Sequence, residues 1–246
     1  MTLRAVPTKI SSWMIQRCGP QCTYRCDSWT LWSKYYLIAA GRLRMARTGR
    51  PREFDREQAL EAAMMLFWKR GYEATSLTQL QDCMGGISPA SFYSAFGSKE
   101  ELFREAVHRF LETFGKATES LRNDSLPPRK AIEVALRRSA RMQTTASHPL
   151  GCLIVLGASN CSPQNDHVVA LLASERARIR QGIRRHITRA VENGDLPPTT
   201  EVVSLTTMFS TFLLGISFEA RDGTTGKDID AAISRLMRLW DEARND

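Results

Sequence analysis

Apolar and polar positions follow a helical period from residue 55 onward. Asp55 is suited to cap a helix, and apolar residues then recur at Leu60, Ala63, Met64 and Phe67. This i, i+3, i+4, i+7 spacing is typical of an amphipathic helix. Gly71 is a suitable C-terminal stop. The pattern therefore predicts a first helix between Asp55 and Gly71.

Three further helix starts follow closely. Thr75 or Ser76 can cap a short second helix, and the pair Gly85-Gly86 permits the left-handed backbone of a tight turn after it. Ser88 is followed by a proline at the first position of a third helix. Ser98 opens a fourth helix as the first residue of an S-x-x-E capping box with Glu101. The apolar stripe of that fourth helix consists of Phe103, Ala106, Val107, Phe110 and Phe114.

The order helix, short helix, glycine turn, short helix, preceded by a basic arm, is that of a helix-turn-helix motif. The third helix has two different faces. Phe92 and Phe96 lie four residues apart and can anchor it in a three-helix core. The side chains on its other face are small and polar enough for the helix to enter a DNA major groove. We therefore expect a DNA-binding domain over residues 45–100.

These residues resemble the signature of TetR-family transcriptional regulators between about residues 55 and 105. The resemblance rests on Thr75-Ser76-Leu77, Gly86-Ile87-Ser88, Phe92-Tyr93, Phe96 and Ser98-Lys99-Glu100-Glu101-Leu102-Phe103. The Gly85-Gly86 turn is one residue longer than the commonest form in that family. The resemblance implies an all-α fold, with an N-terminal three-helix helix-turn-helix domain and a C-terminal helical domain (101–246) for ligand binding and dimerisation.

The same resemblance implies roles for individual residues. Thr75 and Ser76 would offer a hydroxyl and helix N-terminal amides to phosphate. Tyr93 matches the family's phosphate-binding tyrosine, and Lys99 matches the lysine at the start of the fourth helix. The base-reading stretch 88–91 has no Arg or Asn, so sequence reading would depend on contacts to thymine methyls, hydroxyl hydrogen bonds, water and DNA shape. Alternatively, Tyr93 closes the small core, Lys99 is simply solvated and the arm is an untethered tail. The candidate DNA-binding residues are Arg47, Arg50, Arg52, Thr75, Ser76, Ser88, Pro89, Ala90, Ser91, Tyr93 and Lys99.

The second half of the chain is also helical in pattern. It predicts a helix over 129–145, a short buried helix over 152–158 and a long arginine-rich helix over 166–193. Two last helices carry apolar seams that step by three and four residues, as heptads do. Two such seams offer more apolar surface than one core needs, so we expect a four-helix homodimer interface, with an intrachain bundle as the alternative. The predicted interface residues are Val202, Leu205, Phe209, Ile216, Ile229, Ile233, Leu236 and Trp240.

The resemblance further implies a small-molecule pocket between the DNA-binding domain and the dimer helices. The candidate lining residues are Phe110, Phe114, Met142, Cys152, Leu156 and Phe212, for which ordinary core packing is the alternative. Cys152 would sense electrophiles or oxidants if neighbouring groups stabilised its thiolate. The alternative is that it is a small buried hydrophobe.

Charge and composition add exclusions. The 246 residues carry a net charge of +8, but residues 1–44 hold seven basic side chains and one acid, which leaves +2 for the rest. Net charge is therefore a weak argument for a nucleic-acid partner. The longest apolar runs, 35–41 and 151–158, are too short to cross a bilayer, so we expect no membrane partner. Scattered cysteines suit a reducing cytoplasm.

Residues 1–44 differ from the rest of the chain. They contain three of the five tryptophans and lack a sustained helical or strand period. We interpret them as a disordered or mis-assigned extension. Cys18, Cys22 and Cys26 are spaced more widely than usual zinc ligands and have no nearby histidine, so we expect no metal there.

These observations favour a DNA-binding transcriptional regulator, most simply a repressor, that a small-molecule effector releases from a palindromic operator. It would act as a homodimer without catalysis or cofactors. Two alternatives remain open at this point. One is a thiol-dependent enzyme, with Cys152 as nucleophile, His148 or His167 as base and Asp166 as orienter. The other is a DNA-binding protein that has no effector.

Overall fold

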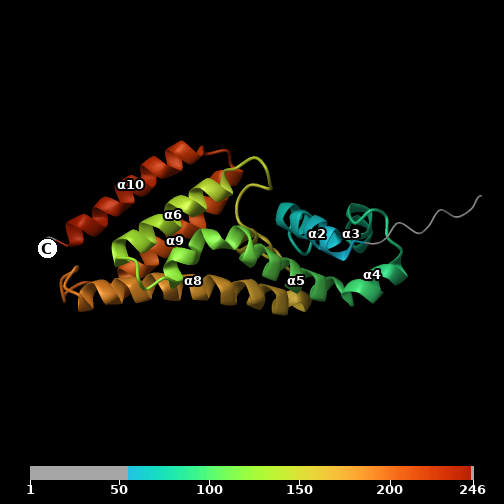
Figure 1. Ribbon diagram of the computed structural model, residues 1–246, viewed down its shortest axis with the longest axis horizontal. Coiled ribbons are helices and arrows are strands. Elements are labelled where there is room, and N and C mark those ends of the chain that lie inside the picture. Colours follow the sequence, from blue (N-terminus) through green and yellow to red (C-terminus); the bar gives the residue numbers. More distant parts are fainter. Residues whose placement is uncertain (1–54, 245–246) are drawn as a thin grey trace, which may run out of the picture. The chain divides into compact units, whose positions relative to one another are not determined.

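Residues 55–244 are described by a computed structural model, drawn in Figure 1. All regular elements in this range are helical, which confirms the predicted all-α fold. The extension 1–44, with its cysteine triplet, and the arm residues Arg47, Arg50 and Arg52 lie outside the described residues. The helices are α2 (Arg56–Arg70), α3 (Leu77–Cys83), α4 (Pro89–Phe96), α5 (Lys99–Glu112), α6 (Pro128–Gln143), α7 (Leu153–Leu156), α8 (Asp166–Glu192), α9 (Val202–Arg221) and α10 (Gly226–Ala243), with 3-10 segments η2 (Phe114–Arg122) and η3 (Pro163–Asn165).

Side-chain caps fix the starts of the first helices. Asp55 accepts hydrogen bonds from two backbone amides of the first turn of α2, each at 3.0 Å. The box expected at Ser98 and Glu101 forms only in part, because Ser98 accepts from the Glu101 amide while the Glu101 carboxylate lies against Gly97. A complete box forms instead at α3, where Ser76 and Gln79 each accept from the other's amide. Such caps satisfy amides that a helix start leaves unpaired.

The turn between α3 and α4 depends on its two glycines. Gly85 and Gly86 have φ angles of 88° and 76°, in the region that side chains with a Cβ avoid. A Cβ at either position would meet no other atom within 4 Å, so the requirement comes from the backbone alone. The helix α4 that follows the turn packs against α5 and has one exposed face.

One hydrophobic cluster unites α2–α5 with parts of the second half. Phe67, Phe92 and Phe103 are completely buried in it, and Leu153 of α7 and Leu172 of α8 belong to the same cluster. No break in packing therefore marks the predicted division at residue 100. Burying each such side chain contributes roughly 1.5–3 kcal/mol, so the first helices are held partly by the second half.

A second cluster fills the space between α6, α8, α9 and α10, and α6 packs against the other three (Figure 1). Six residues of the predicted dimer seam are buried in this cluster within one chain: Phe209, Ile216, Ile229, Ile233, Leu236 and Trp240. Val202 and Leu205 are partly buried against it. This corrects the sequence-based interpretation, because heptad spacing reports a buried face without saying which chain buries it.

Helix α9 has a further property. By length and composition it is the one described helix that could cross a membrane, although the uninterrupted apolar runs in the sequence are short. Its inner face nevertheless packs against α6 and α8, and Phe209 and Ile216 on that face are buried. Ser210, Ser217 and Thr206 interrupt the apolar pattern, which explains why no long apolar run is visible in the sequence.

Candidate DNA interface and ligand cavity

Helix α4 has one buried and one exposed face. Phe92 and Phe96 are 0% and 3% exposed and fix the helix to the core. On the other face Pro89, Ala90 and Ser91 are exposed, and the neighbouring Tyr93 is 53% exposed. The alternative that Tyr93 closes the small core is therefore wrong. Its ring meets only the edge of the Phe92 ring, at a centroid distance of 5.5 Å.

The two serines at the start of α4 are occupied with each other. Ser88 Oγ accepts a hydrogen bond from the Ser91 amide at 3.1 Å, and the two hydroxyl oxygens are 2.9 Å apart. Ser88 thus caps the helix, as the sequence predicts. A base contact from either hydroxyl would share this bond, whereas Pro89 and Ala90 offer apolar surface directly.

The predicted phosphate ligands at α3 differ from each other in burial. Thr75 is completely buried, and its Oγ1 donates to the carbonyl of Gly71 at 2.6 Å. Its hydroxyl therefore does not face solvent, which corrects the expectation that it contacts phosphate. Ser76 is exposed at the helix start and provides the cap. Of these two residues, only Ser76 has a side chain that a phosphate can reach.

Lys99 is the first residue of α5 and is partly buried. Its Nζ lies 4.2 Å from the centroid of the Tyr72 ring, a cation–π geometry. Burial lowers the pKa of Lys99, and the negative charge of Glu73 opposes that change. Lys99 is therefore neither a freely solvated lysine nor a buried one, and its amine is held at the junction of α5 with the α2–α3 loop.

Sequence reasoning missed Arg56, which fixes the far end of α4. Its Nη2 forms an ion pair with Glu105 of α5 at 2.7 Å, and its Nε donates to the Ala95 carbonyl at 3.2 Å. The guanidinium carbon lies 4.8 Å from the centroid of the Phe96 ring. Nothing local in the sequence indicates this arrangement, because the partners lie 39 to 49 residues away.

A mainly apolar cavity of about 40 Å³ lies between η2, α6, α7 and α9. Four of the six candidate pocket residues border it, namely Phe110, Phe114, Met142 and Cys152. Leu156 is instead buried in packing, and Phe212 packs against the second core cluster. Leu213 and Leu214 line the cavity in place of Phe212. A helix turns about 100° per residue, so a one-residue difference changes the face.

The Cys152 thiol is held in its neutral form. Burial raises its pKa to about 11, an effect that hydrogen bonds from nearby amides and the charge of Arg176 only partly offset. The ring of His148 stacks on Trp68 at 4.6 Å, and His167 pairs with Glu100 at 3.0 Å. Within residues 55–244, no hydrogen bond joins Cys152 to either histidine or to Asp166, so the residues of the enzyme alternative are not assembled.

Residues 151–157, here called the cavity-lining segment, also hold α2 through backbone carbonyls. Trp68 Nε1 donates to the carbonyl of Gly151 at 3.3 Å, and the Tyr72 amide donates to that of Gly157 at 2.7 Å. Arg221, at the end of α9, donates to the carbonyl of Trp68 at 3.0 Å. The helix that supports α4 is thus tied to the residues on either side of Cys152.

Known proteins share both the sequence and the arrangement. The family model described as "Bacterial regulatory proteins, tetR family" matches residues 59–106. The chain is 31% identical over 198 residues to the HTH-type transcriptional repressor ComR of Escherichia coli, covering 79% of this chain and 92% of ComR. It is 32% identical over 177 residues to the HTH-type transcriptional repressor BdcR of the same organism, covering 71% of this chain and 83% of BdcR.

A solved structure is similar to this chain in fold as well as in sequence. It is a cysteine mutant of the TetR-family regulator CifR complexed with 26-base-pair double-strand operator DNA. The match has a TM-score of 0.71 and 38% identity, and it covers 78% of this chain and all of that one. It confirms the predicted order of a helix-turn-helix domain followed by a helical domain. The chain therefore belongs to the TetR family of transcriptional regulators.

Proposed function

We propose that this protein is a sequence-specific DNA-binding repressor that acts as a homodimer in the cytoplasm and leaves its operator when a small molecule binds. The main support is the two-faced helix α4, in which Phe92 and Phe96 are buried while residues 88–91 and Tyr93 face solvent. The names of ComR and BdcR as repressors, and the operator complex of CifR, support the same function.

In the proposed complex, α4 enters the major groove. Pro89 and Ala90 meet thymine methyl groups, and the serine hydroxyls contribute one adaptable hydrogen bond. Tyr93, Ser76 and Lys99 contact phosphates on either side of the groove. The arm residues Arg47, Arg50 and Arg52 complete the binding to the backbone. Few direct base contacts are available, so DNA shape would carry much of the specificity.

A second copy would pack on the outer face of α9. Val203 and Phe218 are 64% and 57% exposed there, and the exposed Thr207 and Thr211 lie between them on the same face by their helical spacing. The face spans about 22 Å at 1.5 Å per residue. On α10, Leu239 is 43% exposed. Large exposed apolar side chains grouped in this way favour a protein interface, and a dimer would present two α4 helices to a palindrome.

The effector would act through the segment that both lines the cavity and holds α2. A ligand against Cys152 and Val155 would displace the Gly151 and Gly157 carbonyls that accept hydrogen bonds from α2. A coupling of about 1–3 kcal/mol changes DNA affinity by roughly 5- to 150-fold. Such a change is enough to empty an operator without disrupting the fold.

Selection of bound sequences from a random duplex pool tests the main proposal. We expect a palindrome whose half-sites lie about one helical turn apart. Tyr93→Phe removes one hydroxyl from the proposed DNA face, whereas Tyr72→Phe removes one from a buried ring and serves as its control. A monomer that shows no preference among duplexes at moderate salt would contradict the proposal.

The two other function classes are tested with the selected operator. A protein without an effector would keep its DNA when challenged with a broad set of small molecules. The enzyme alternative requires turnover of a small electrophile that Cys152→Ala abolishes. The raised pKa of Cys152 does not favour it, because only a small fraction of a thiol with a pKa of about 11 is thiolate at neutral pH.

A further inference from the structure

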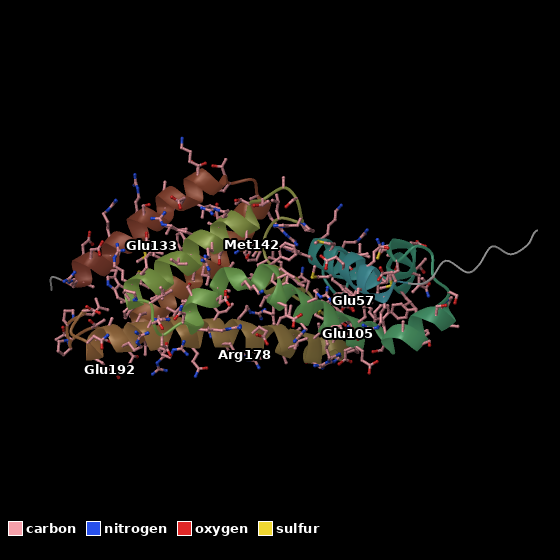
Figure 2. All side chains as sticks on the ribbon, in the orientation of Figure 1. Glu57, Glu105, Glu133, Met142, Arg178 and Glu192 are labelled. Atoms are coloured by element: carbon pink, nitrogen blue, oxygen red, sulfur yellow. The ribbon has the colours of Figure 1, made fainter. Side chains whose placement is uncertain are left out.

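A second, larger hollow lies beside the apolar cavity. It is a groove of about 250 Å³ between η2 and α8. Arg122, Arg178 and Arg185 line it, and no carboxylate does. Figure 2 labels Arg178 on α8 and Met142, which lines the apolar cavity, on α6. We call this hollow the arginine groove.

The floor of the arginine groove is built from a close helix contact. A Cβ on Gly182 of α8 would lie 3.0 Å from the Cβ of Leu121 and 3.1 Å from its carbonyl oxygen, so a larger residue would push η2 away. Arg185 then donates from Nη2 to the same Leu121 carbonyl at 2.6 Å. The groove is therefore held in place by packing and by a hydrogen bond.

The groove carries more positive charge than the nearby carboxylates neutralise. Arg178 pairs with Glu175 at 2.6 Å, and Arg185 pairs with Asp124 at 3.1 Å. Within residues 55–244, no carboxylate forms an ion pair with Arg122. An anion bound among the three guanidinium groups would meet Arg122, which has no ion-pair partner within residues 55–244. It would also meet Arg178 and Arg185, which are paired but exposed to solvent. Arginine binds carboxylates with two parallel hydrogen bonds, which makes it well suited to this role.

The arginine groove and the apolar cavity share a wall. Thr118 of η2 and Ile179 of α8 line both hollows. On the far side of this wall, the lining includes Phe110, Met142 and Leu213 and exposes almost only hydrocarbon. A charged region and an apolar region therefore adjoin across two side chains. Each region alone fits many ligands, but the pair together selects a ligand with two chemically different ends.

From this juxtaposition we infer that the effector is an amphipathic carboxylate. Its apolar body occupies the cavity, and its carboxylate lies in the arginine groove. Because the cavity is only about 40 Å³, it takes the end of a short alkyl chain. This inference rests on the proposed release of DNA by a small molecule and adds the chemical class of that molecule.

Calorimetric titration of the full chain without DNA tests the site directly. Hexanoate has both ends, hexan-1-ol has only the apolar one, and inorganic phosphate has only the charge. We expect hexanoate to bind at least tenfold more tightly than either comparison compound. Equal binding of hexanoate and hexan-1-ol, or of hexanoate and phosphate, would overturn the inference.

Substitutions then locate each end of the ligand. Arg122→Gln combined with Arg178→Gln should weaken hexanoate binding at least tenfold and leave hexan-1-ol binding unchanged. The control is Arg184→Gln, which removes an arginine of the same helix that lines a different hollow. Ile179→Phe should weaken hexanoate binding and leave phosphate binding unchanged. Unaltered hexanoate binding in the arginine double variant contradicts the assignment, and Arg122→Lys, which retains the charge, tests the site should the double variant unfold.

Release of DNA is measured separately, with a labelled operator and fluorescence anisotropy. Hexanoate that binds through the arginines but leaves the operator occupied supports the site and contradicts effector release. An operator released by a different compound, with no arginine-dependent binding of hexanoate, overturns the inference alone. The two failures are therefore distinguishable.

Discussion

The helices α2–α4 and the helices α6–α10 are specified by different kinds of sequence signal. In the first region, Asp55, Ser76 and Ser88 each bond to amides two or three residues ahead, so helix starts are determined locally. In the second region, long apolar seams determine that a face is buried, and the partner depends on contacts far along the chain. Local signals therefore define where a helix begins, whereas only tertiary packing defines what it touches.

The largest effect should come from the seam that is buried within the chain. Trp240→Ala leaves a cavity beside Phe209, whose ring centroid is 6.1 Å from that of Trp240. We expect a loss of about 3–5 kcal/mol in the free energy of unfolding, measured with denaturant. Arg238→Ala, at an exposed position of the same helix, should change it by less than about 0.5 kcal/mol. Equal losses would mean that Trp240 is not buried within the chain.

The same contrast within α4 separates stability from DNA binding. Phe92→Ala removes a completely buried ring and should cost about 3–5 kcal/mol of folding stability. Tyr93→Ala removes an exposed ring and should leave stability within about 1 kcal/mol, while operator affinity falls about tenfold, equivalent to about 1.4 kcal/mol. Denaturation and operator titration measure the two quantities. Unchanged operator affinity in Tyr93→Ala would remove this residue from the proposed interface.

Removing a local cap should have a smaller effect. Ser76→Ala combined with Gln79→Ala breaks both side-chain hydrogen bonds of the complete capping box at α3 and should cost about 1 kcal/mol. Ser98→Ala loses only one such bond at α5, so its cost should be at or below that value. Denaturant unfolding of both variants measures the difference. A larger loss in Ser98→Ala would show that Glu101 contributes more than the structure indicates.

The smallest effect concerns pH and the buried His186 of α8. Burial, and then the charges of Arg189 and Arg185, lower the pKa of His186, while Asp124 acts in the opposite direction. The folded protein thus binds fewer protons than the unfolded chain, and stability is lost as pH falls below the ordinary histidine value of 6.5. His186→Phe should flatten the dependence of unfolding free energy on pH between pH 5 and 7. An unchanged slope would assign it to other groups.

The sequence predicts the first region well because its determinants are local. Helix starts, the Gly85-Gly86 turn and the buried pair Phe92 and Phe96 all follow from residues within one turn of each other. The burial of Thr75 is not predicted, because a threonine hydroxyl can donate either to a phosphate or to a backbone carbonyl. In the structure it donates to the carbonyl of Gly71. Arg56 escapes because its partners are distant in sequence.

The second region is predicted as helices but not as contacts. Four of six candidate cavity residues line the cavity, whereas Leu156 is buried elsewhere and Phe212 packs against the second core cluster. Residues of α9 that were expected to face a second chain, such as Phe209 and Ile216, are buried within one chain, since period alone does not say which chain covers an apolar face. The segment η2 is a 3-10 stretch that the sequence does not predict as a separate element.

The joint between α2 and the cavity-lining segment is made to backbone oxygens, at Gly151, Gly157 and Trp68. Every residue has such an oxygen, so most substitutions around the cavity can alter its shape without deleting an acceptor. The exceptions are Gly151, where φ is 81° and a Cβ would lie 2.9 Å from the Ser217 carbonyl oxygen, and Gly157, where a Cβ would lie 2.6 Å from the Leu153 carbonyl oxygen. Substitutions at the other positions can therefore change the shape of the cavity while the hydrogen bonds that join this segment to α2 remain.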